Sequence, residues 1–314
     1  VSCLIFINSS LFLQAFQSNK TENFKYILII LLSCFAITIK LNAAPLALLA
    51  LVSFVMMIRQ NKTFNLPILV SLTAIIFFIP WLIGNVMVSG WLAYPVDGID
   101  LFQVDWKVPK EVLQFERFSI IQWGKLPGGD IYETAQLSLM EWLPGWFMFH
   151  DVFNRAMMLL ALVSIPITMW FQIKQKNSAI LVLLALAMIG ILFCLSNGPH
   201  IRYTFGYMWI LIGLGLYSIS HWIQKVTIKS FSYPLLFVAL LLAGSKYIQT
   251  PKLSLFELKA YPKIEIEAQN WNNNQVYITQ QNSSCWDQFP CSYYMLENCK
   301  MRGTKLEEGF RVER

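Results

Sequence analysis

The chain has 314 residues, of which 56% are hydrophobic and only 13% are charged, and its formal net charge at pH 7 is +6. Soluble domains carry about 25% charged residues, so this chain has too few polar side chains to cover one soluble core. The composition excludes a disordered chain, a basic DNA-binding domain and a small disulfide scaffold, and it indicates a membrane protein with several spans.

Eight apolar stretches approach the length of about 20 residues that a helix needs to cross a bilayer. They cover roughly residues 1–16, 24–40, 43–58, 66–86, 154–173, 178–196, 203–220 and 233–249. The first stretch begins at Val1 without a basic n-region or a cleavage site, so we expect the chain to be the C-terminal part of a longer protein. The expected fold class is an all-α integral membrane helical bundle with about eight spans in this part.

Polar stretches divide the chain into four expected regions. Residues 1–86 form a first transmembrane block, truncated at its start, and residues 153–249 form a second block. Residues 87–152 form a loop between the two blocks, and residues 250–314 form a small α/β tail.

Lysine and arginine are distributed unevenly between the short loops that alternate along the chain. One set of loops holds most of them, namely Lys20, Lys25, Arg59, Lys62, Lys174, Lys176, Lys225 and Lys229, and the other set holds only Lys40 and Arg202. Because basic loops stay in the cytoplasm, we expect residues 87–152 and 250–314 on the outer face of a bacterial inner membrane. The predicted spans contain no acidic residue, which argues against an ion-coupled carrier.

Lys40 and Arg202 are the two cations that break this trend, each at the outer end of a predicted span. Two cations there can hold the phosphates of a lipid-linked donor, or they can extend to the headgroups as isolated side chains do. Asn85, near the outer end of its span, either lines a cavity or marks a simple helix end. His200 lies two residues before Arg202 and is a further candidate for substrate binding.

The loop at 87–152 is rich in tryptophan, which prefers the headgroup level of a bilayer. The pattern predicts an amphipathic interfacial helix over 109–123 and a second helical piece over 132–150, interrupted at Pro144 and Gly145. Asp105, His150 and Asp151 are the loop candidates for acid–base chemistry, although solvated carboxylates and structural histidines share this pattern. No metal motif or cofactor motif is evident, but outer-face carboxylates are suitable ligands for a divalent ion.

The tail contains short alternating patterns and three of the six cysteines. Residues 263–267 and 275–279 alternate apolar and polar side chains, and this pattern predicts two strands. Cysteines outside the cytoplasm tend to pair, so we predict a disulfide between Cys285 and Cys291.

Several of these residues together resemble the GT-C type of integral-membrane glycosyltransferases, which use sugars linked to lipid phosphates. The resemblance depends on Lys40, on the run from Trp81 through Asn85 to Tyr94 and Pro95, on the long outer loop, and on Arg202. It implies donor-side roles for Lys40, Asn85 and Arg202. Gly84 stands where such enzymes often have an arginine, and the acidic residue of their first outer loop would lie upstream of Val1.

A closer resemblance covers nearly the whole chain. The motifs are Asp-Trp-Lys-Val-Pro at 105–109, the Cys-Trp to Pro-Cys run at 285–291, Arg302-Gly303, and Gly-Phe-Arg at 309–311. They resemble those of an uncharacterised family of bacterial polytopic membrane proteins.

These observations favour a membrane protein similar to glycosyltransferases that transfers a sugar from a polyprenyl-phosphate donor at the outer face. A glycan polymerase or ligase that uses the same donors remains an alternative, as does a transporter or scaffold without enzymatic activity. The expected partners are the polyprenyl-phosphate donor and membrane lipids. No feature of the sequence indicates nucleic-acid binding.

Overall fold

The computed structural model describes residues 1–18, 22–62, 64–175, 177–222, 265–271, 274–279, 291–292, 299–305 and 308–312. The chain divides into two compact units, and each is described by itself. The first unit comprises Val1–Asp100 and Lys110–Gln224, and the second comprises Leu101–Pro109 and Lys225–Arg314.

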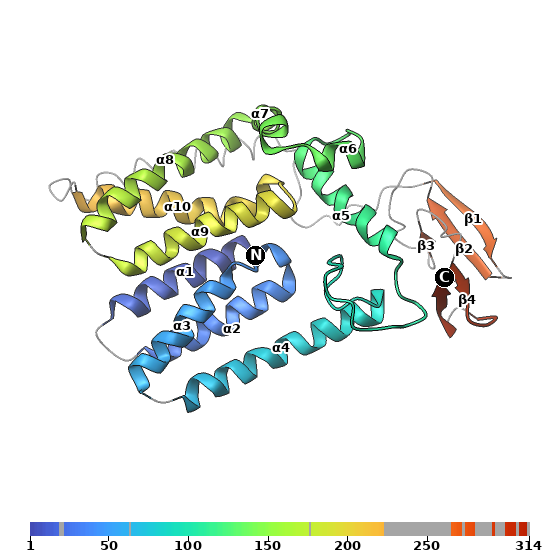
Figure 1. Ribbon diagram of the computed structural model, residues 1–314, viewed down its shortest axis with the longest axis horizontal. Coiled ribbons are helices and arrows are strands. Elements are labelled where there is room, and N and C mark those ends of the chain that lie inside the picture. Colours follow the sequence, from blue (N-terminus) through green and yellow to red (C-terminus); the bar gives the residue numbers. More distant parts are fainter. Residues whose placement is uncertain are drawn as a thin grey trace, which may run out of the picture. The chain divides into compact units, whose positions relative to one another are not determined.

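The first unit is helical (Figure 1). Its elements are α1 (Ser2–Gln17), α2 (Asn23–Ile39), the 3₁₀ turn η1 (Leu41–Ala43), α3 (Leu46–Asn61), α4 (Asn65–Ser89), α5 (Lys110–Lys125), α6 (Ile131–Gln136), α7 (Leu139–Phe149), α8 (Val152–Gln175), α9 (Ser178–Asn197) and α10 (Ile201–Trp222). In the bundle, α8 packs along α10, α2 packs along α3, and α1 contacts both α2 and α10. The core is built mainly from α1, α2, α9 and α10, whose buried side chains include Phe12, Tyr26, Leu183 and Tyr207.

Three helices of the described residues are long and apolar enough to cross a membrane, namely α4, α8 up to Gln172, and α9. The chain is therefore compatible with a membrane protein, but the predicted count of eight spans is not supported. Helices α1, α2 and α3 have 16, 17 and 16 residues, and at 1.5 Å per residue they reach about 24–26 Å, short of a hydrocarbon core of about 30 Å. The seventh predicted stretch forms α10, which is not among these three helices. The eighth predicted stretch lies outside the described residues.

Helices α4 and α9 bury very different shares of their apolar side chains. Large side chains of α4, among them Leu69, Ile76 and Val88, are 61%, 62% and 83% exposed. The side chains of α9 that face α1 and α10 are almost completely buried. An apolar surface as extended as that of α4 is unusual in a soluble monomer and is expected of a helix that contacts lipid or another protein.

The loop between α4 and α8 contains three helices, α5, α6 and α7, in the segments that the sequence predicts to be helical. Helix α5 begins directly after Pro109, in agreement with the predicted amphipathic helix. The predicted interruption at Pro144 is wrong, because α7 runs through this proline and the break lies between α6 and α7. Ser138 and Glu141 form a capping box that starts α7, and the buried Trp142 and Trp146 anchor one face of α7 on both sides of the proline.

The second unit contains the described strands. Its strands are β1 (Ile266–Trp271), β2 (Asn274–Thr279), β3 (Cys291–Ser292), β4 (Cys299–Met301) and β5 (Phe310–Val312). Strands β1 and β2 form an antiparallel hairpin, β3 pairs in parallel with β2, and β4 pairs with β5. The strand predicted at 275–279 is confirmed, whereas the strand predicted at 263–267 lies further along the chain. Cys285 is outside the described residues, so its disulfide with Cys291 stays a prediction.

The segment Leu101–Pro109 belongs to this second unit although it precedes α5 in the sequence. The backbone N–H of Val312 donates a hydrogen bond of 2.9 Å to the carbonyl oxygen of Asp105. The guanidinium of Arg302 pairs with the carboxylate of Asp105 and lies 5.2 Å from the ring centroid of Trp106. Asp105 therefore connects the segment to strand β5 and to Arg302.

Candidate functional site

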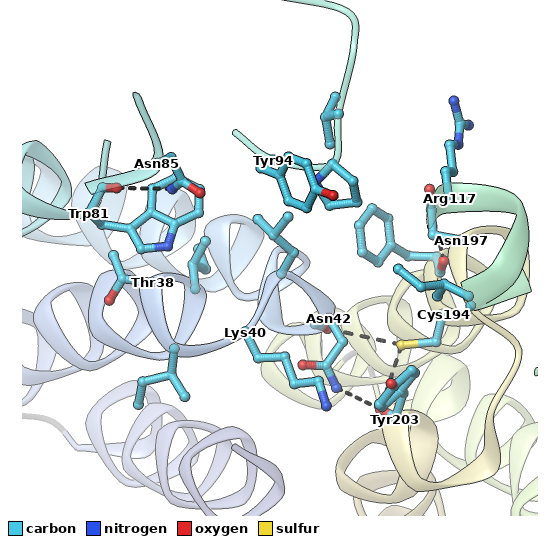
Figure 2. A pocket seen from close by; sticks show the side chains of 18 residues that line it. Thr38, Lys40, Asn42, Trp81, Asn85, Tyr94, Arg117, Cys194, Asn197 and Tyr203 are labelled. Atoms are coloured by element: carbon cyan, nitrogen blue, oxygen red, sulfur yellow. Dashed lines mark hydrogen bonds between the residues drawn. The ribbon is translucent and has the colours of Figure 1, made fainter. Parts of the chain in front are cut away.

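The first unit contains a pocket of about 470 Å³ at the end of the bundle where α2, α4 and α9 end and α10 begins (Figure 2). Its polar lining residues are Thr38, Lys40, Asn42, Asn85, Arg117 and Asn197, and its aromatic residues include Trp81, Tyr94 and Tyr203. Apolar residues such as Ile37, Ile39, Val96, Ile120 and Phe193 form the rest of the wall. No carboxylate is among these lining residues, and the two charged residues of the lining, Lys40 and Arg117, are both cations.

Lys40 reaches the pocket because α2 ends immediately before it. The backbone of Lys40 is extended, with φ −159° and ψ 126°, and its N–H donates to the carbonyl of Ala36 in the last turn of α2. The chain then turns through η1, which separates α2 from α3. The ammonium of Lys40 lies 4.1 Å from the ring centroid of Tyr203, within the range of a cation–π contact.

Tyr203 brings the two cations predicted from the sequence to one aromatic ring. The guanidinium of Arg202 lies 5.1 Å from the Tyr203 ring centroid, and its Nη2 donates to the Tyr203 hydroxyl over 3.1 Å. Lys40 contacts the same ring, although about half of the chain separates it from Arg202 in the sequence. Lys40 and Tyr203 line the pocket, whereas Arg202 is not among the lining residues.

Asn42 connects the turn after α2 to α10. Its Nδ2 donates to the carbonyl of Tyr203 over 3.2 Å, and its own carbonyl accepts from the Tyr207 hydroxyl over 2.9 Å. Gly190 of α9 allows this arrangement, since a Cβ there would lie 2.4 Å from the Tyr207 ring. The position of Lys40 is thus set by contacts between η1, α9 and α10.

Asn85 lines the opposite side of the pocket, on the last turns of α4 (Figure 2). Its Nδ2 donates to the carbonyl of Trp81 one turn earlier, over 2.9 Å. This bond orients the amide and leaves the carbonyl oxygen of the side chain as an acceptor for a ligand.

His200 and His150 lie outside the pocket lining. Burial lowers the pKa of His200, and repulsion by Arg202, by Lys40 and by His150 when it is protonated lowers it further. Its Nδ1 accepts from the backbone N–H of Arg202 over 3.3 Å. Burial also lowers the pKa of His150, against a smaller opposing effect of Asp151, and its ring packs 4.7 Å from that of Trp146. Both histidines are therefore neutral at pH 7.

The structure does not bring the predicted acid–base residues together. Asp105 lies in the second unit and pairs with Arg302. The side chain of Asp151 accepts from the backbone N–H of Asn154 over 2.7 Å, at the start of α8. Within the part of the chain that the structure describes, no group of three or more histidine, cysteine or acidic side chains could hold a metal ion.

Arg117 of α5 is a lining residue that sequence reasoning missed. Its Nη1 lies 3.9 Å from Oδ1 of Asp97, and the ammonium of Lys110 lies 4.0 Å from Oδ2 of the same carboxylate. In the sequence Arg117 is one of several charges on an amphipathic helix, and no local signal separates it from Lys110.

Close packing fixes α5 and α7 against the turn between α9 and α10. A Cβ at Gly124 would lie 2.7 Å from Pro199, so α5 approaches this turn at a position where only glycine fits. The indole N–H of Trp146 donates to the carbonyl of Pro199 over 2.6 Å. These contacts hold Arg117 and Ile120, one turn apart on α5, at the pocket.

A family model described as "Domain of unknown function (DUF8201)" matches residues 1–209. The chain belongs to the DUF8201 family. The matched DUF8201 region includes every residue that lines the pocket, from Ile37 to Tyr203, and it ends within α10. Neither the curated proteins nor the solved structures contain a match to the chain.

Proposed function

We propose that this DUF8201 chain is a membrane protein similar to GT-C glycosyltransferases. In this proposal the chain binds a polyprenyl-phosphate-linked sugar in the pocket and transfers the sugar to an acceptor. The observation that carries the proposal is the pocket lining, which combines Lys40, amide side chains and an apolar wall without a carboxylate. Such a site attracts an anion and rejects a cation. Its volume of about 470 Å³ is within the range of about 300–1,000 Å³ for small-molecule sites.

Each part of the lining suits one part of this donor. The Lys40 ammonium can donate charge-assisted hydrogen bonds to phosphate oxygens and stabilise the charge of the departing phosphate. Asn42, Asn85 and Asn197 offer amide donors and acceptors of the kind that recognise sugar hydroxyls. The apolar residues Ile37, Ile39 and Phe193 suit the first part of a prenyl chain.

In this proposal the pocket faces the outer side of a bacterial inner membrane, as the distribution of lysine and arginine predicts. The shorter helices α1, α2 and α3 and the less apolar α10 then cross the membrane together with the three longer apolar helices. Local thinning of the bilayer and long basic side chains that extend to the headgroups accommodate spans that are shorter than the hydrocarbon core.

Sugar transfer also needs a base for the acceptor hydroxyl. The lining residues supply no carboxylate, so the proposal assigns donor binding to this pocket and acceptor activation to a group from another part of the protein. Donor binding is the step assigned to this pocket, so binding of the donor is the primary test.

The test measures binding of a polyprenyl-phosphate sugar to the full protein in lipid nanodiscs, with uncharged polyprenol as the matched ligand. We expect the phosphate ligand to bind at least about tenfold more tightly than polyprenol. We expect Lys40→Gln to weaken binding of the phosphate ligand about tenfold, since a hydrogen bond to a charged group contributes roughly 1.5–3 kcal/mol. Equal binding of both ligands by the wild-type protein would exclude the proposed function.

A further inference from the structure

We propose that Arg117 is a second phosphate-binding cation of this pocket, and that Asp97 holds it in the ligand-free protein and competes with the ligand for it. The inference extends the proposed function, on which it depends only for the lipid-linked character of the ligand. The shared chemistry of the ligand is that of an amphiphile with a phosphate group.

The position of Arg117 makes it available to the pocket. It is one helical turn before Ile120 on α5, and both residues line the cavity. Its side chain is 53% exposed, and Figure 2 shows its guanidinium pointing away from Lys40. In the structure the two cations contact other groups, Lys40 the ring of Tyr203 and Arg117 the carboxylate of Asp97.

The contact between Arg117 and Asp97 is a weak one. Their closest charged atoms are 3.9 Å apart, near the limit for an ion pair, and both side chains reach solvent. Pairs of this kind are weak, because water screens the two charges and holding both side chains in one geometry costs entropy. A phosphate offers more oxygens and accepts the guanidinium in a bidentate geometry, so it can displace Asp97.

Asp97 keeps a partner when Arg117 leaves. The ammonium of Lys110 lies 4.0 Å from its other carboxylate oxygen, and Lys110 does not line the pocket. Moving Arg117 to a ligand therefore leaves no carboxylate without a counter-charge. Asp97 directly follows Val96, which lines the pocket, and its Oδ1 lies 3.9 Å from Nη1 of Arg117.

The chain offers a matched control for this inference. Arg117 and Lys110 are both exposed cations of α5 and both pair with Asp97, but only Arg117 lines the pocket. An effect of the general electrostatic field would be similar for the two, whereas direct contact with a ligand would be specific to Arg117.

The experiment titrates the full protein in phosphatidylcholine nanodiscs with polyprenyl phosphate and, separately, with phosphatidylglycerol. For whichever of these two ligands binds the wild-type protein, we expect Arg117→Gln to weaken binding about tenfold. Lys110→Gln should change the affinity less than about twofold, and Asp97→Asn should tighten binding about threefold. Arg117→Lys keeps the charge but loses the bidentate geometry, so its affinity should lie between those of the wild type and Arg117→Gln.

Equal losses for Arg117→Gln and Lys110→Gln, or no loss for Arg117→Gln, would overturn the inference. If phosphatidylglycerol binds with the same Arg117 dependence and polyprenyl phosphate does not bind, the phosphate site is supported and the proposed function fails. If neither ligand binds to the wild-type protein, both fail. If polyprenyl phosphate binds with a dependence on Lys40 but not on Arg117, only the role of Arg117 fails.

Discussion

The two cationic ends of the pocket differ in how firmly they are held. At the α10 end, Lys40 and Arg202 contact one tyrosine ring, and hydrogen bonds from Asn42 and Tyr207 tie the backbone around Lys40 to α10. At the α5 end, Arg117 pairs with the partly buried carboxylate of Asp97, and the closest charged atoms are 3.9 Å apart. The comparison indicates a preorganised cation on one side and an adjustable cation on the other, and the following experiments test it.

The largest effect is expected for Gly190→Ala, which should disrupt the preorganised end. A Cβ at Gly190 would meet the Tyr207 ring at 2.4 Å, and overpacking of this kind costs typically about 1–3 kcal/mol and sometimes more. Thermal unfolding of the purified protein in detergent measures the loss. Gly213→Ala on α10 is the control, because no atom lies within 4 Å of its Cβ position. Equal unfolding temperatures for the two variants would contradict the close packing of α9 on α10.

The next largest effect is expected at Tyr203, where two variants distinguish the role of the ring from that of the hydroxyl. Tyr203→Phe removes the acceptor of Arg202 but keeps the ring beside Lys40, so donor binding should fall less than about twofold. Tyr203→Ala removes the cation–π contact and part of the pocket wall, and a loss of roughly tenfold is expected. Titration of polyprenyl phosphate with both variants provides the measurement. A similar loss for both would show that the hydroxyl, rather than the ring, positions the cations.

A pH dependence is expected from His200 and His150, whose pKa values are lowered by burial. Below the unfolded-state pKa of about 6.5, the unfolded chain takes up protons that the folded chain still excludes, so stability falls as the pH decreases from 8 towards 5.5. Unfolding temperatures at the two pH values measure this loss. In a variant with His150→Gln and His200→Gln the decrease should be smaller, and an unchanged decrease would assign it to other groups.

The smallest effect is expected for Arg202→Gln. Arg202 contacts Tyr203 but does not line the pocket, so its loss should weaken donor binding less than about twofold, because it removes a cation–π contact with the ring and no contact with the ligand. The same titration compares it with Arg117→Gln. A greater loss for Arg202→Gln would restore it as a direct phosphate ligand and would reverse the comparison between the two ends.

Several local features were predictable because short-range patterns determine them. Proline before an amphipathic run marks the start of α5, and alternation marks strand β2. The break between α6 and α7 was placed wrongly at Pro144, because the capping box at Ser138 and the burial of Trp142 and Trp146 outweigh the proline. Lys40 was singled out by its position against the charge trend, whereas Arg117 gave no comparable signal.

The amino-acid sequence by itself determined an apolar, mainly helical chain, with a helix after Pro109 and strands near its end, since composition and periodicity act over a few residues. Only the tertiary structure decided where each helix ends, that Asp105 belongs to the second unit, and that Lys40 and Arg117 line one pocket. The pocket depends on which faces of distant helices pack together. Packing of that kind follows from the shapes of many side chains, such as the space at Gly190 for Tyr207, and not from any local pattern.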